Sequence, residues 1–374
     1  MGSFGITGSH STARSKGPGV TVGRSGASIG VVSYIDCDYW PLNTCLFVTD
    51  FHGNNPRYAY YLLSTLHLAS FNSGSAQPSL NRNFIHPIRI TVPKRCEQDE
   101  IVALLGALDD KIELNRRMNA TLEAMARAIF KDWFVDFGPT RAKAEGRPPY
   151  LAPDLWALFP DALDNDDKPV GWEDDTLGSF TSLQNGYAFK SADWRDSGIP
   201  VVKIGSVKPA FVDLDQVSFV DKALAIEKAD FQLSIGDMLV GLTGYVGETG
   251  RIPPTQCPPM LNQRVGKFVP VLELESFVFS CVRQPEFKEF AESKSHGSAQ
   301  ANVSTKDLLT YPIVNSGERI IRAFCHIASH LFKASLANSG QTSILAQTRD
   351  LLLPKLMSGD IRLRDAEKAV EAVA

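Results

Sequence analysis

The sequence predicts an α+β fold in which two copies of a β-rich domain each lead into a long helix, and the two helices pack as an antiparallel coiled coil. Two observations carry this prediction. Short motifs from the first part of the chain recur in the same order about 220 residues later, and each half ends in a helical stretch with a period of 3.5 residues. The chain has 374 residues, 44% of them hydrophobic and 21% charged, which is typical of about two to three globular domains.

The internal repeat rests on four matches whose offsets differ by only a few residues. They are Val22–Gly26 with Val240–Gly244, Leu42-Asn43 with Leu261-Asn262, Gly74–Gln77 with Gly297–Gln300, and His86–Ile88 with Tyr311–Ile313. Four matches in one order indicate a duplicated structural unit.

The first part of each copy reads as short strands separated by Gly, Pro and Asn. The expected strands are Gly19–Val22, Ile29–Ile35 and Cys45–Val48 in copy one, and Ile199–Ile204, Asp237–Val240 and Arg264–Val269 in copy two. About fifty residues equivalent to Trp172–Asp221 are mostly missing from copy one. Either the start is misplaced, or the first domain is a natural remnant.

The second part of each copy is a long helix with a polar interruption in its apolar seam. Steps of four and three residues give Ile101, Leu105, Leu108, Ile112, Asn115, Asn119, Leu122, Ala126, Ile129 and Trp133. The equivalent seam is Phe324, Ala328, Leu331, Ser335, Asn338, Thr342, Leu345, Arg349, Leu352 and Leu356. Asn115 and Asn338 are interpreted as register-fixing, with a functional contact as the alternative, while Arg349 breaks the pattern.

Two similar units in one chain favour pseudo-twofold closure, which would run the helices antiparallel. A helix of about 35 residues is roughly 50 Å long.

Several kinds of chemistry are disfavoured. The sequence has no GxxxxGK[ST] loop. Arg147–Tyr150 lacks the first Asn or Asp of an adenine-methyltransferase motif, and His326 and His330 lack the Glu of a zinc HExxH motif, so we expect no metal site. Six scattered cysteines and the absence of a signal sequence or an 18-residue apolar run fit a cytoplasmic protein without membrane segments.

The net charge of −4 does not exclude a nucleic-acid partner. Eight acidic residues and one basic residue lie between Pro153 and Asp175, so the rest of the chain carries +3. A weakly positive body can bind DNA through local patches.

The helical motifs resemble those of type I restriction–modification specificity subunits. The matching segments are Glu97–Val102, Leu108–Arg117, Leu122–Arg127 and Trp133–Phe137, then Pro160, Gly171-Trp172 and Gln184–Ser191, and finally Leu351–Ile361. The resemblance covers essentially the whole chain, with a shortened N-terminal recognition domain as the departure.

The resemblance implies a non-catalytic subunit that reads a bipartite double-stranded DNA target in defence against foreign DNA. It also implies docking of two methylation subunits per chain and, through them, of restriction subunits. S-adenosylmethionine, ATP and Mg would belong to those partners, and this chain would bind no cofactor. The alternative is a truncated, DNA-binding-defective scaffold or competitor that binds only the methylation subunit.

The expected organisation alternates recognition domains with spacer helices. It comprises an incomplete target recognition domain 1 (1–95), a central spacer helix (96–140), an acidic and Pro-rich linker (141–170), target recognition domain 2 (171–316), a distal spacer helix (317–362) and a C-terminal tail (363–374).

Candidate DNA contacts are loop residues that could donate to base edges or phosphates. In copy one they are Arg24, Ser25, Asn43, Ser75, Gln77, Asn81 and Arg82. In copy two they are Tyr187, Lys190, Lys203, Thr243, Tyr245, Asn262, Gln263, Arg264, Ser298 and Gln300.

The repeat suggests how to sort these residues. Repeated pairs such as Asn43/Asn262 are interpreted as structural or phosphate-binding, and unrepeated residues such as Arg24, Gln263 and Arg264 as base readers. An apolar stripe off the helix seam needs a cover, either the recognition domains or the methylation subunit, and the candidate docking residues are Leu104, Met125, Phe130 and Phe134.

Overall fold

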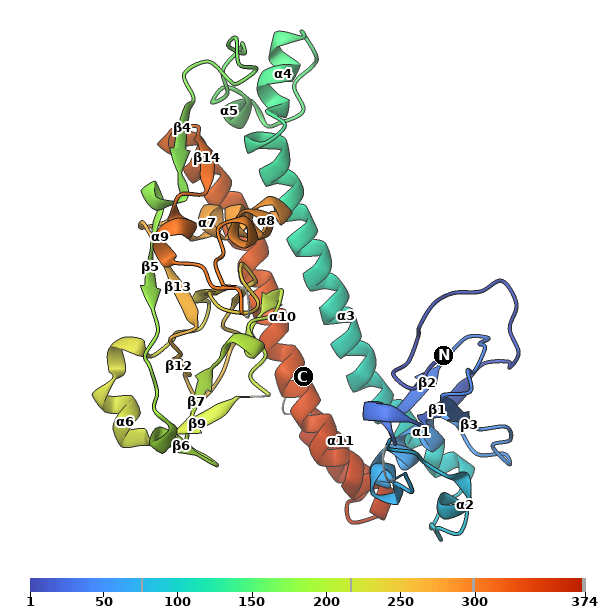
Figure 1. The fold of residues 1–374 in the computed structure, drawn as a ribbon. Helices are drawn as coiled ribbons and strands as arrows, with labels where there is room; N and C mark the ends of the chain where they lie inside the picture. Colours follow the sequence, from blue (N-terminus) through green and yellow to red (C-terminus); the bar gives the residue numbers. More distant parts are fainter. Residues whose placement is uncertain (75–76, 216, 298–299, 372–374) are drawn as a thin grey trace. The chain divides into compact units, whose positions relative to one another are not determined.

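The structure, a computed structural model, describes residues 1–74, 77–215, 217–297 and 300–371. The candidates Ser75 and Ser298 lie outside these residues. The chain divides into unit 1, made of Met1–Leu114 and Thr342–Ala374, and unit 2, made of Asn115–Gln341. Two helices contribute to both units, α3 (Arg95–Phe134) and α10 (Glu318–Ser358) (Figure 1).

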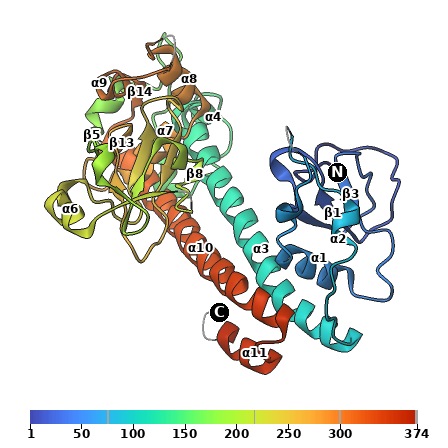
Figure 2. The same ribbon diagram turned by 60° about the horizontal axis from the view of Figure 1, so that its bottom comes forward.

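Unit 1 contains a three-stranded antiparallel sheet in the order β2-β1-β3, formed by β1 (Gly19–Gly23), β2 (Val32–Ile35) and β3 (Cys45–Phe47). Helix α1 (Pro56–Thr65) packs beside it, and Figure 2 shows α1 alongside α3. Asn55 caps α1, since its side chain accepts hydrogen bonds from the backbone N–H groups of Arg57 and Tyr58. The remaining helices of unit 1 are α2 (Arg82–Ile85) and α11 (Leu363–Glu371).

The described residues of unit 2 form three sheets. Their strand orders are β5-β13-β10-β11-β8, β12-β7-β9-β6 and β14-β4. The strands are β4 (Glu173–Thr176), β5 (Thr181–Asn185), β6 (Trp194–Arg195), β7 (Ile199–Val202), β8 (Ala210–Phe211), β9 (Ser218–Val220), β10 (Met238–Gly241), β11 (Thr249–Arg251), β12 (Met260–Leu261), β13 (Val265–Pro270) and β14 (Pro312–Asn315). The helices are α4 (Gly138–Ala144), α5 (Pro153–Trp156), α6 (Lys222–Glu227), α7 (Glu275–Val282), α8 (Pro285–Ser293) and α9 (Thr305–Leu309).

The predicted fold class is confirmed by the strands and by the two long helices. Every expected strand segment overlaps an observed strand, and the β2-β1-β3 order of unit 1 recurs in unit 2 as β11-β10-β13. In both copies the central strand pairs antiparallel with its two neighbours. The repeat is therefore present in the structure as well as in the sequence.

The helix seam is apolar where the 3.5-residue period predicts it, and the helices pair antiparallel. In unit 1, seam residues share buried clusters in opposite chain order, Ile101 and Leu105 with Leu352 and Leu356, and Leu108 and Ile112 with Leu345. In unit 2, Asn115 Nδ2 donates to Gln341 Oε1 at 3.0 Å, and Asn338 Nδ2 donates to Asn119 Oδ1 at 3.1 Å. The polar interruptions therefore bond to polar groups of the facing helix, as register-fixing residues do.

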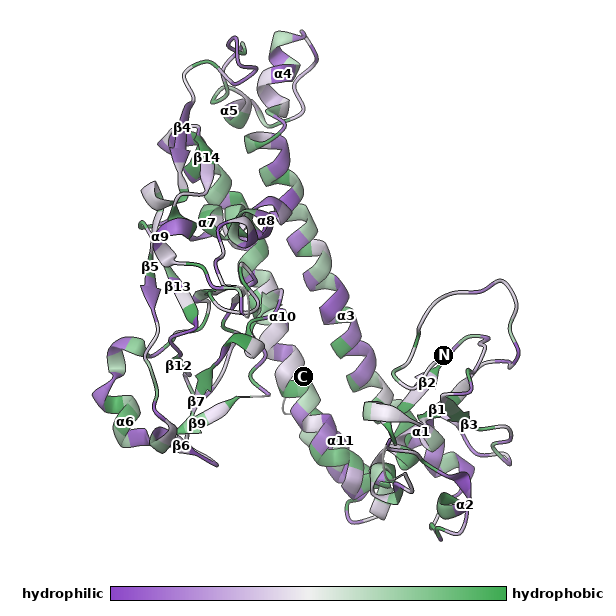
Figure 3. Ribbon diagram, in the orientation of Figure 1, coloured by the Kyte–Doolittle hydropathy of each residue, from purple (hydrophilic) through white to green (hydrophobic). Residues whose placement is uncertain are grey.

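The predicted C-terminal tail differs from the structure, because residues 363–371 form α11, with Ala366 fully buried. Along α3 and α10, hydrophilic and hydrophobic residues alternate (Figure 3). Within the described residues, no helix combines the length and the apolar character needed to cross a membrane.

Candidate nucleic-acid interface

Three loops of unit 1 converge on Arg24, the residue that follows β1. Its backbone N–H donates to the Thr44 carbonyl at 3.0 Å, and its carbonyl accepts from the Leu80 N–H at 2.8 Å. The Gly26 N–H donates to the Pro78 carbonyl at 3.0 Å. These bonds fix residues 24–26, 42–44 and 77–82 as one loop surface at the end of the central strand.

Unit 2 builds the same surface with equivalent bonds. The Leu242 N–H donates to the Arg264 carbonyl at 3.0 Å, and the Leu242 carbonyl accepts from the Val303 N–H at 2.9 Å. The Gly244 N–H donates to the Ala301 carbonyl at 2.8 Å. The loops at 242–245, 262–264 and 300–303 therefore correspond to the three loops of unit 1.

Glycine is required at the same position of both loop surfaces. Gly26 has a φ of +78° and Gly244 a φ of +76°, a left-handed conformation that side chains disfavour. The repeated glycine of the sequence motif is thus a backbone requirement and carries no recognition.

The strand ladders correct one part of the sequence alignment. Gly23 pairs with Cys45 in unit 1, and Gly241 pairs with Val265 in unit 2. Position 42 therefore corresponds to 262, and the Cys45 N–H to Leu42 carbonyl bond recurs from Val265 to Asn262. The match of Asn43 with Asn262 is wrong by one residue, since Asn43 corresponds to Gln263 and Thr44 to Arg264.

The unit 1 candidates lie mostly on the surface. The side chains of Arg24, Asn43, Gln77, Asn81 and Arg82 are exposed, and that of Ser25 is half-buried. Asn81 has a structural task, because its Oδ1 accepts from the Asn83 N–H at 3.0 Å and caps α2.

The unit 2 candidates separate into exposed side chains and side chains that hold the loops. Lys190, Tyr245, Gln263, Arg264 and Gln300 are exposed, and Tyr245 retains 62% of its surface. The Gln263 N–H donates to the carbonyl of half-buried Tyr187 at 3.0 Å, which places Tyr187 at the edge of the same surface.

Three unit 2 candidates are engaged within the protein. Asn262 is buried, and its Oδ1 accepts from the Arg264 N–H at 3.2 Å. Thr243 Oγ1 donates to Asn302 Oδ1 at 2.7 Å, and Lys203 Nζ donates to Ser218 Oγ at 2.6 Å. Lys203 Nζ also lies 3.9 Å from the centroid of a Trp ring at position 194. These side chains are scaffold groups in this structure.

The exposed arginines carry charge that the protein leaves uncompensated. Within the described part of the chain, neither Arg24 nor Arg264 forms an ion pair with an acidic side chain. Guanidinium groups free at a loop surface can donate two parallel hydrogen bonds to guanine or to phosphate.

Thr44 is a surface residue that sequence reasoning missed. Its backbone carbonyl ties the loop to Arg24, its side chain is exposed, and it occupies the position of Arg264. Only the strand register reveals this equivalence, because the two side chains differ.

The proposed docking residues are not one surface. Phe130 and Phe134 are each 5% exposed, and their rings lie 5.8 Å and 5.2 Å from the ring of Phe277 in the core of unit 2. The assignment of these two residues to partner docking is wrong, since the core of unit 2 itself covers them. Leu104 is half-buried, while Met125 is 47% and Met118 42% exposed.

Comparisons with known proteins point to one family. Residues 2–124 match the type I restriction modification DNA specificity domain. The HindI specificity subunit of Haemophilus influenzae is 26% identical over 343 residues, a match that covers 79% of this chain and 73% of that protein. The MjaIX specificity subunit of Methanocaldococcus jannaschii is 26% identical over 325 residues, covering 82% of this chain and 69% of that protein.

A solved structure supports the fold. The S subunit of the type I restriction-modification system from M. genitalium aligns with a TM-score of 0.53 at 18% identity, covering 94% of this chain and 85% of that one. Residues 2–124 thus match a type I restriction modification DNA specificity domain, and most of the chain is similar in sequence to type I restriction enzyme specificity subunits.

Proposed function

We propose that this chain reads a bipartite DNA target, with the loop surface of unit 1 on one half-site and that of unit 2 on the other. The observation that carries the proposal is the shared loop framework. The same three backbone hydrogen bonds build both surfaces, while the exposed side chains on them differ. A common scaffold with divergent side chains is what two readers of different base sequences need.

The proposed readers are the exposed side chains that the scaffold does not use. In unit 1 they are Arg24, Asn43, Gln77 and Arg82, and in unit 2 Tyr245, Gln263, Arg264 and Gln300. Arg suits guanine, Asn and Gln suit adenine, and we propose Lys190 and Ser25 as phosphate contacts. The supporting role falls to Asn81, Thr243, Asn262 and Lys203, with Tyr187 at the rim.

The domain limits follow from this division. We propose recognition domains over 1–95 and 171–316, with the paired helices α3 and α10 acting as the spacer that sets the distance between half-sites. An ion pair links the two ends of the linker at 141–170, since Arg141 Nη2 lies 2.6 Å from Asp167 Oδ2.

The helices also offer a docking surface for methylation subunits, which we place at two per chain. Met118 and Met125 are exposed and seven residues apart, so they lie on one face of α3 within unit 2. Specificity subunits are non-catalytic. S-adenosylmethionine, ATP and Mg would therefore be bound by the methylation and restriction subunits.

A second reading, that the chain is a scaffold without DNA readout from unit 1, also has an observation in its favour. The described residues of unit 1 form one three-stranded sheet, whereas unit 2 adds a four-stranded sheet beside the shared one. Fewer elements support the first loop surface.

Methylation mapping tests both readings. The chain is co-expressed with its methylation subunit, and the methylated motif is read from genomic DNA. A bipartite motif supports the proposal, and a motif with only one half-site supports loss of readout by unit 1. A complex that forms but methylates no motif would identify a scaffold.

A further inference from the structure

Arg251, at the end of β11 in unit 2, is held between two aromatic rings. Its Cζ lies 4.5 Å from the centroid of the Phe279 ring and 4.8 Å from that of Phe332, and its Nη2 donates to the Phe332 carbonyl at 3.4 Å. Its Nε is buried and has no hydrogen-bond partner among the described residues. The guanidinium is therefore fixed in direction, and because Nε is shielded, the donors that remain for a ligand are those of the two Nη groups.

The surroundings of Arg251 carry excess positive charge. Burial lowers the pKa of Arg251 and the charge of Glu123 raises it, but Glu123 Oε1 already accepts from Arg283 Nε at 2.8 Å and from Arg127 Nη2 at 3.1 Å. Two other guanidinium groups thus already share this carboxylate. Burial lowers the pKa of Arg251 to about 10, because Glu123 does not offset the cost of dehydrating the charge.

A cavity of about 630 Å³ opens beside Arg251 along α10. Its wall includes Phe332, Lys333 and Leu336. Of the two acidic residues that line it, Glu273 is paired with Arg322, which leaves Glu275 against the charges of Arg251 and Lys333.

The cavity is distinct from the loop surface of unit 2. Thr249, the first residue of β11, pairs with Val240 next to the loops, whereas Arg251 pairs with Met238 toward the other end of the strand. Its ligand therefore need not be the DNA that the loops read.

We propose that this cavity binds an oxyanion, of the carboxylate or phosphate class, with Arg251 as the fixed donor and Lys333 as the flexible one. A guanidinium that is already oriented and dehydrated binds an oxyanion with little further cost in entropy. The group comes either from a free anion or from an acidic side chain of a partner protein.

The first arm of the test uses inorganic sulfate and the full chain. Thermal unfolding is followed as sulfate replaces chloride at constant ionic strength. We expect sulfate to raise the Tm of the wild type and of the control Arg319→Met, which removes an exposed arginine of α10, and to have no such effect on Arg251→Met. Circular dichroism checks that Arg251→Met is folded, and Arg251→Lys, which keeps the charge, should bind sulfate with intermediate affinity.

The second arm tests whether the oxyanion is an acidic side chain of a partner protein, and it rests on the proposed function. If sulfate has no effect, Arg251→Met should weaken assembly with the methylation subunit by about tenfold, as expected for a lost charge-assisted hydrogen bond, while Arg319→Met should not. A wild type that fails to assemble would refute the proposed function and leave the sulfate arm decisive. The cavity proposal is overturned if Arg251→Met changes neither the response to sulfate nor assembly.

Discussion

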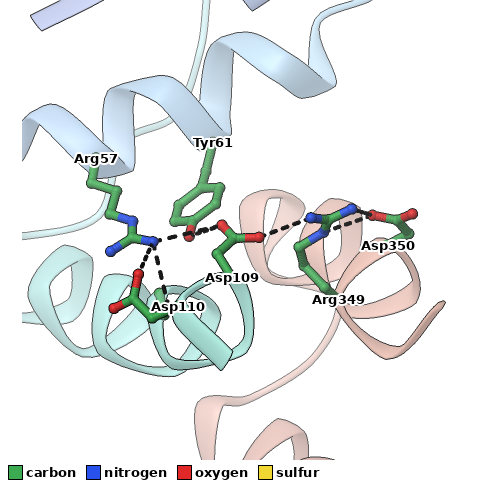
Figure 4. A network of polar contacts seen from close by, with 7 residues as sticks. Arg57, Tyr61, Asp109, Asp110, Arg349 and Asp350 are labelled. Atoms are coloured by element: carbon green, nitrogen blue, oxygen red, sulfur yellow. Dashed lines mark hydrogen bonds and ion pairs between the residues drawn. The ribbon is translucent and has the colours of Figure 1, made fainter. Parts of the chain in front are cut away.

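Arg349 on α10 donates from Nη1 to Asp109 Oδ1 of α3 at 2.8 Å, within unit 1 (Figure 4). The same carboxylate accepts from the Tyr61 hydroxyl at 2.6 Å through Oδ2, and Arg57 Nη2 lies 3.8 Å away. Burial and the Asp109 carboxylate raise the pKa of Tyr61, which keeps its hydroxyl a donor. The arginine that interrupts the apolar seam is therefore one end of a polar network between the helices and α1.

Replacing Asp109 by Ala should destabilise unit 1 more than replacing Arg349 by Leu. Asp109→Ala leaves Arg57, Arg349 and Tyr61 without their shared acceptor, at a cost of about 2–3 kcal/mol. Arg349→Leu removes one donor and restores an apolar seam residue, so we expect a loss of about 1 kcal/mol or less. Urea unfolding of the full chain measures both, with Lys111→Ala on the exposed face of α3 as control. Equal losses for the two variants would contradict the shared-acceptor account.

The seam shows what the sequence could predict and where the prediction stopped. The 3.5-residue period identified Leu105 and Leu352 as seam residues, and both are buried. The prediction succeeds because residues three and four apart lie on one face of a helix, so the sequence period locates the face that packs. The cover of Phe130 and Phe134 depends on residues far along the chain, such as Phe277 and Phe324, so periodicity alone could not decide it.

The sequence located the loops of the candidate site but did not give the correct equivalence of individual residues between the two units. The repeated motifs located both loop surfaces, but matching Asn43 with Asn262 set the register one residue off. Similar side chains were mistaken for equivalent backbone positions, and only ladder pairs such as Gly23 with Cys45 resolve this. Helix α1 did carry a local signal, the Asn55-Pro56 start, that the strand pattern around it obscured.

The amide pair of Asn115 and Gln341 in unit 2 should fix the register of the two helices at a cost in stability. Asn115 is fully buried and its Oδ1 has no partner among the described residues. Asn115→Leu alone should destabilise the chain, because it removes the donor to Gln341. The double variant Asn115→Leu/Gln341→Leu should recover that loss or exceed the wild type, since an apolar pair costs no desolvation of polar groups. Urea denaturation of the wild type, Asn115→Leu, Gln341→Leu and the double variant measures the coupling free energy between the two residues. Additive effects would argue against the pair.

Substitutions at Arg264 and Asn262 should distinguish a side chain that contacts DNA from one that holds the loop in place. Arg264→Ala removes an exposed side chain, so DNA affinity should fall by about tenfold to a hundredfold while the Tm stays unchanged. Asn262→Ala should lower the Tm, because the Arg264 N–H loses its acceptor. Mobility shift on the methylated motif and thermal unfolding give the two readouts. A lower Tm for Arg264→Ala with unchanged DNA affinity would reverse the assignment.

Alkaline pH should weaken unit 2 through a buried thiol. Burial raises the pKa of Cys325 to about 11, above its ordinary value, so the native state holds this proton longer than the unfolded state does. The stabilisation is complete below about pH 8.5 and is lost at about 1.4 kcal/mol per pH unit as pH rises toward 11. Cys281, buried beside it, has a pKa raised in the same direction.

Cys325→Ala tests this linkage through the slope of the unfolding free energy against pH. The absolute free energy of the variant also includes the cost of the small cavity that the substitution leaves, so it is not compared. The free energy of unfolding, measured in urea between pH 8 and 10.5, should fall less steeply in the variant than in the wild type. The exposed thiol variant Cys37→Ala serves as control and should keep the wild-type slope. Parallel slopes for Cys325→Ala and the wild type would exclude a contribution from this thiol.

If α3 and α10 are the spacer, lengthening both should change the gap between half-sites and leave their letters intact. The facing site for insertion is Asn119 with Asn338, which are hydrogen-bonded in unit 2, and α3 is continuous there, so both helices must be extended together. Four residues in each add roughly 6 Å of rise, or one to two base pairs at about 3.4 Å each. They overshoot one turn by about 40°, and the seam, which alternates steps of three and four, absorbs the insertion as a local unwinding. Methylation mapping should then report the same half-sites separated by one or two additional unspecified base pairs. New half-site letters at the original spacing would show that the helices do not set the distance.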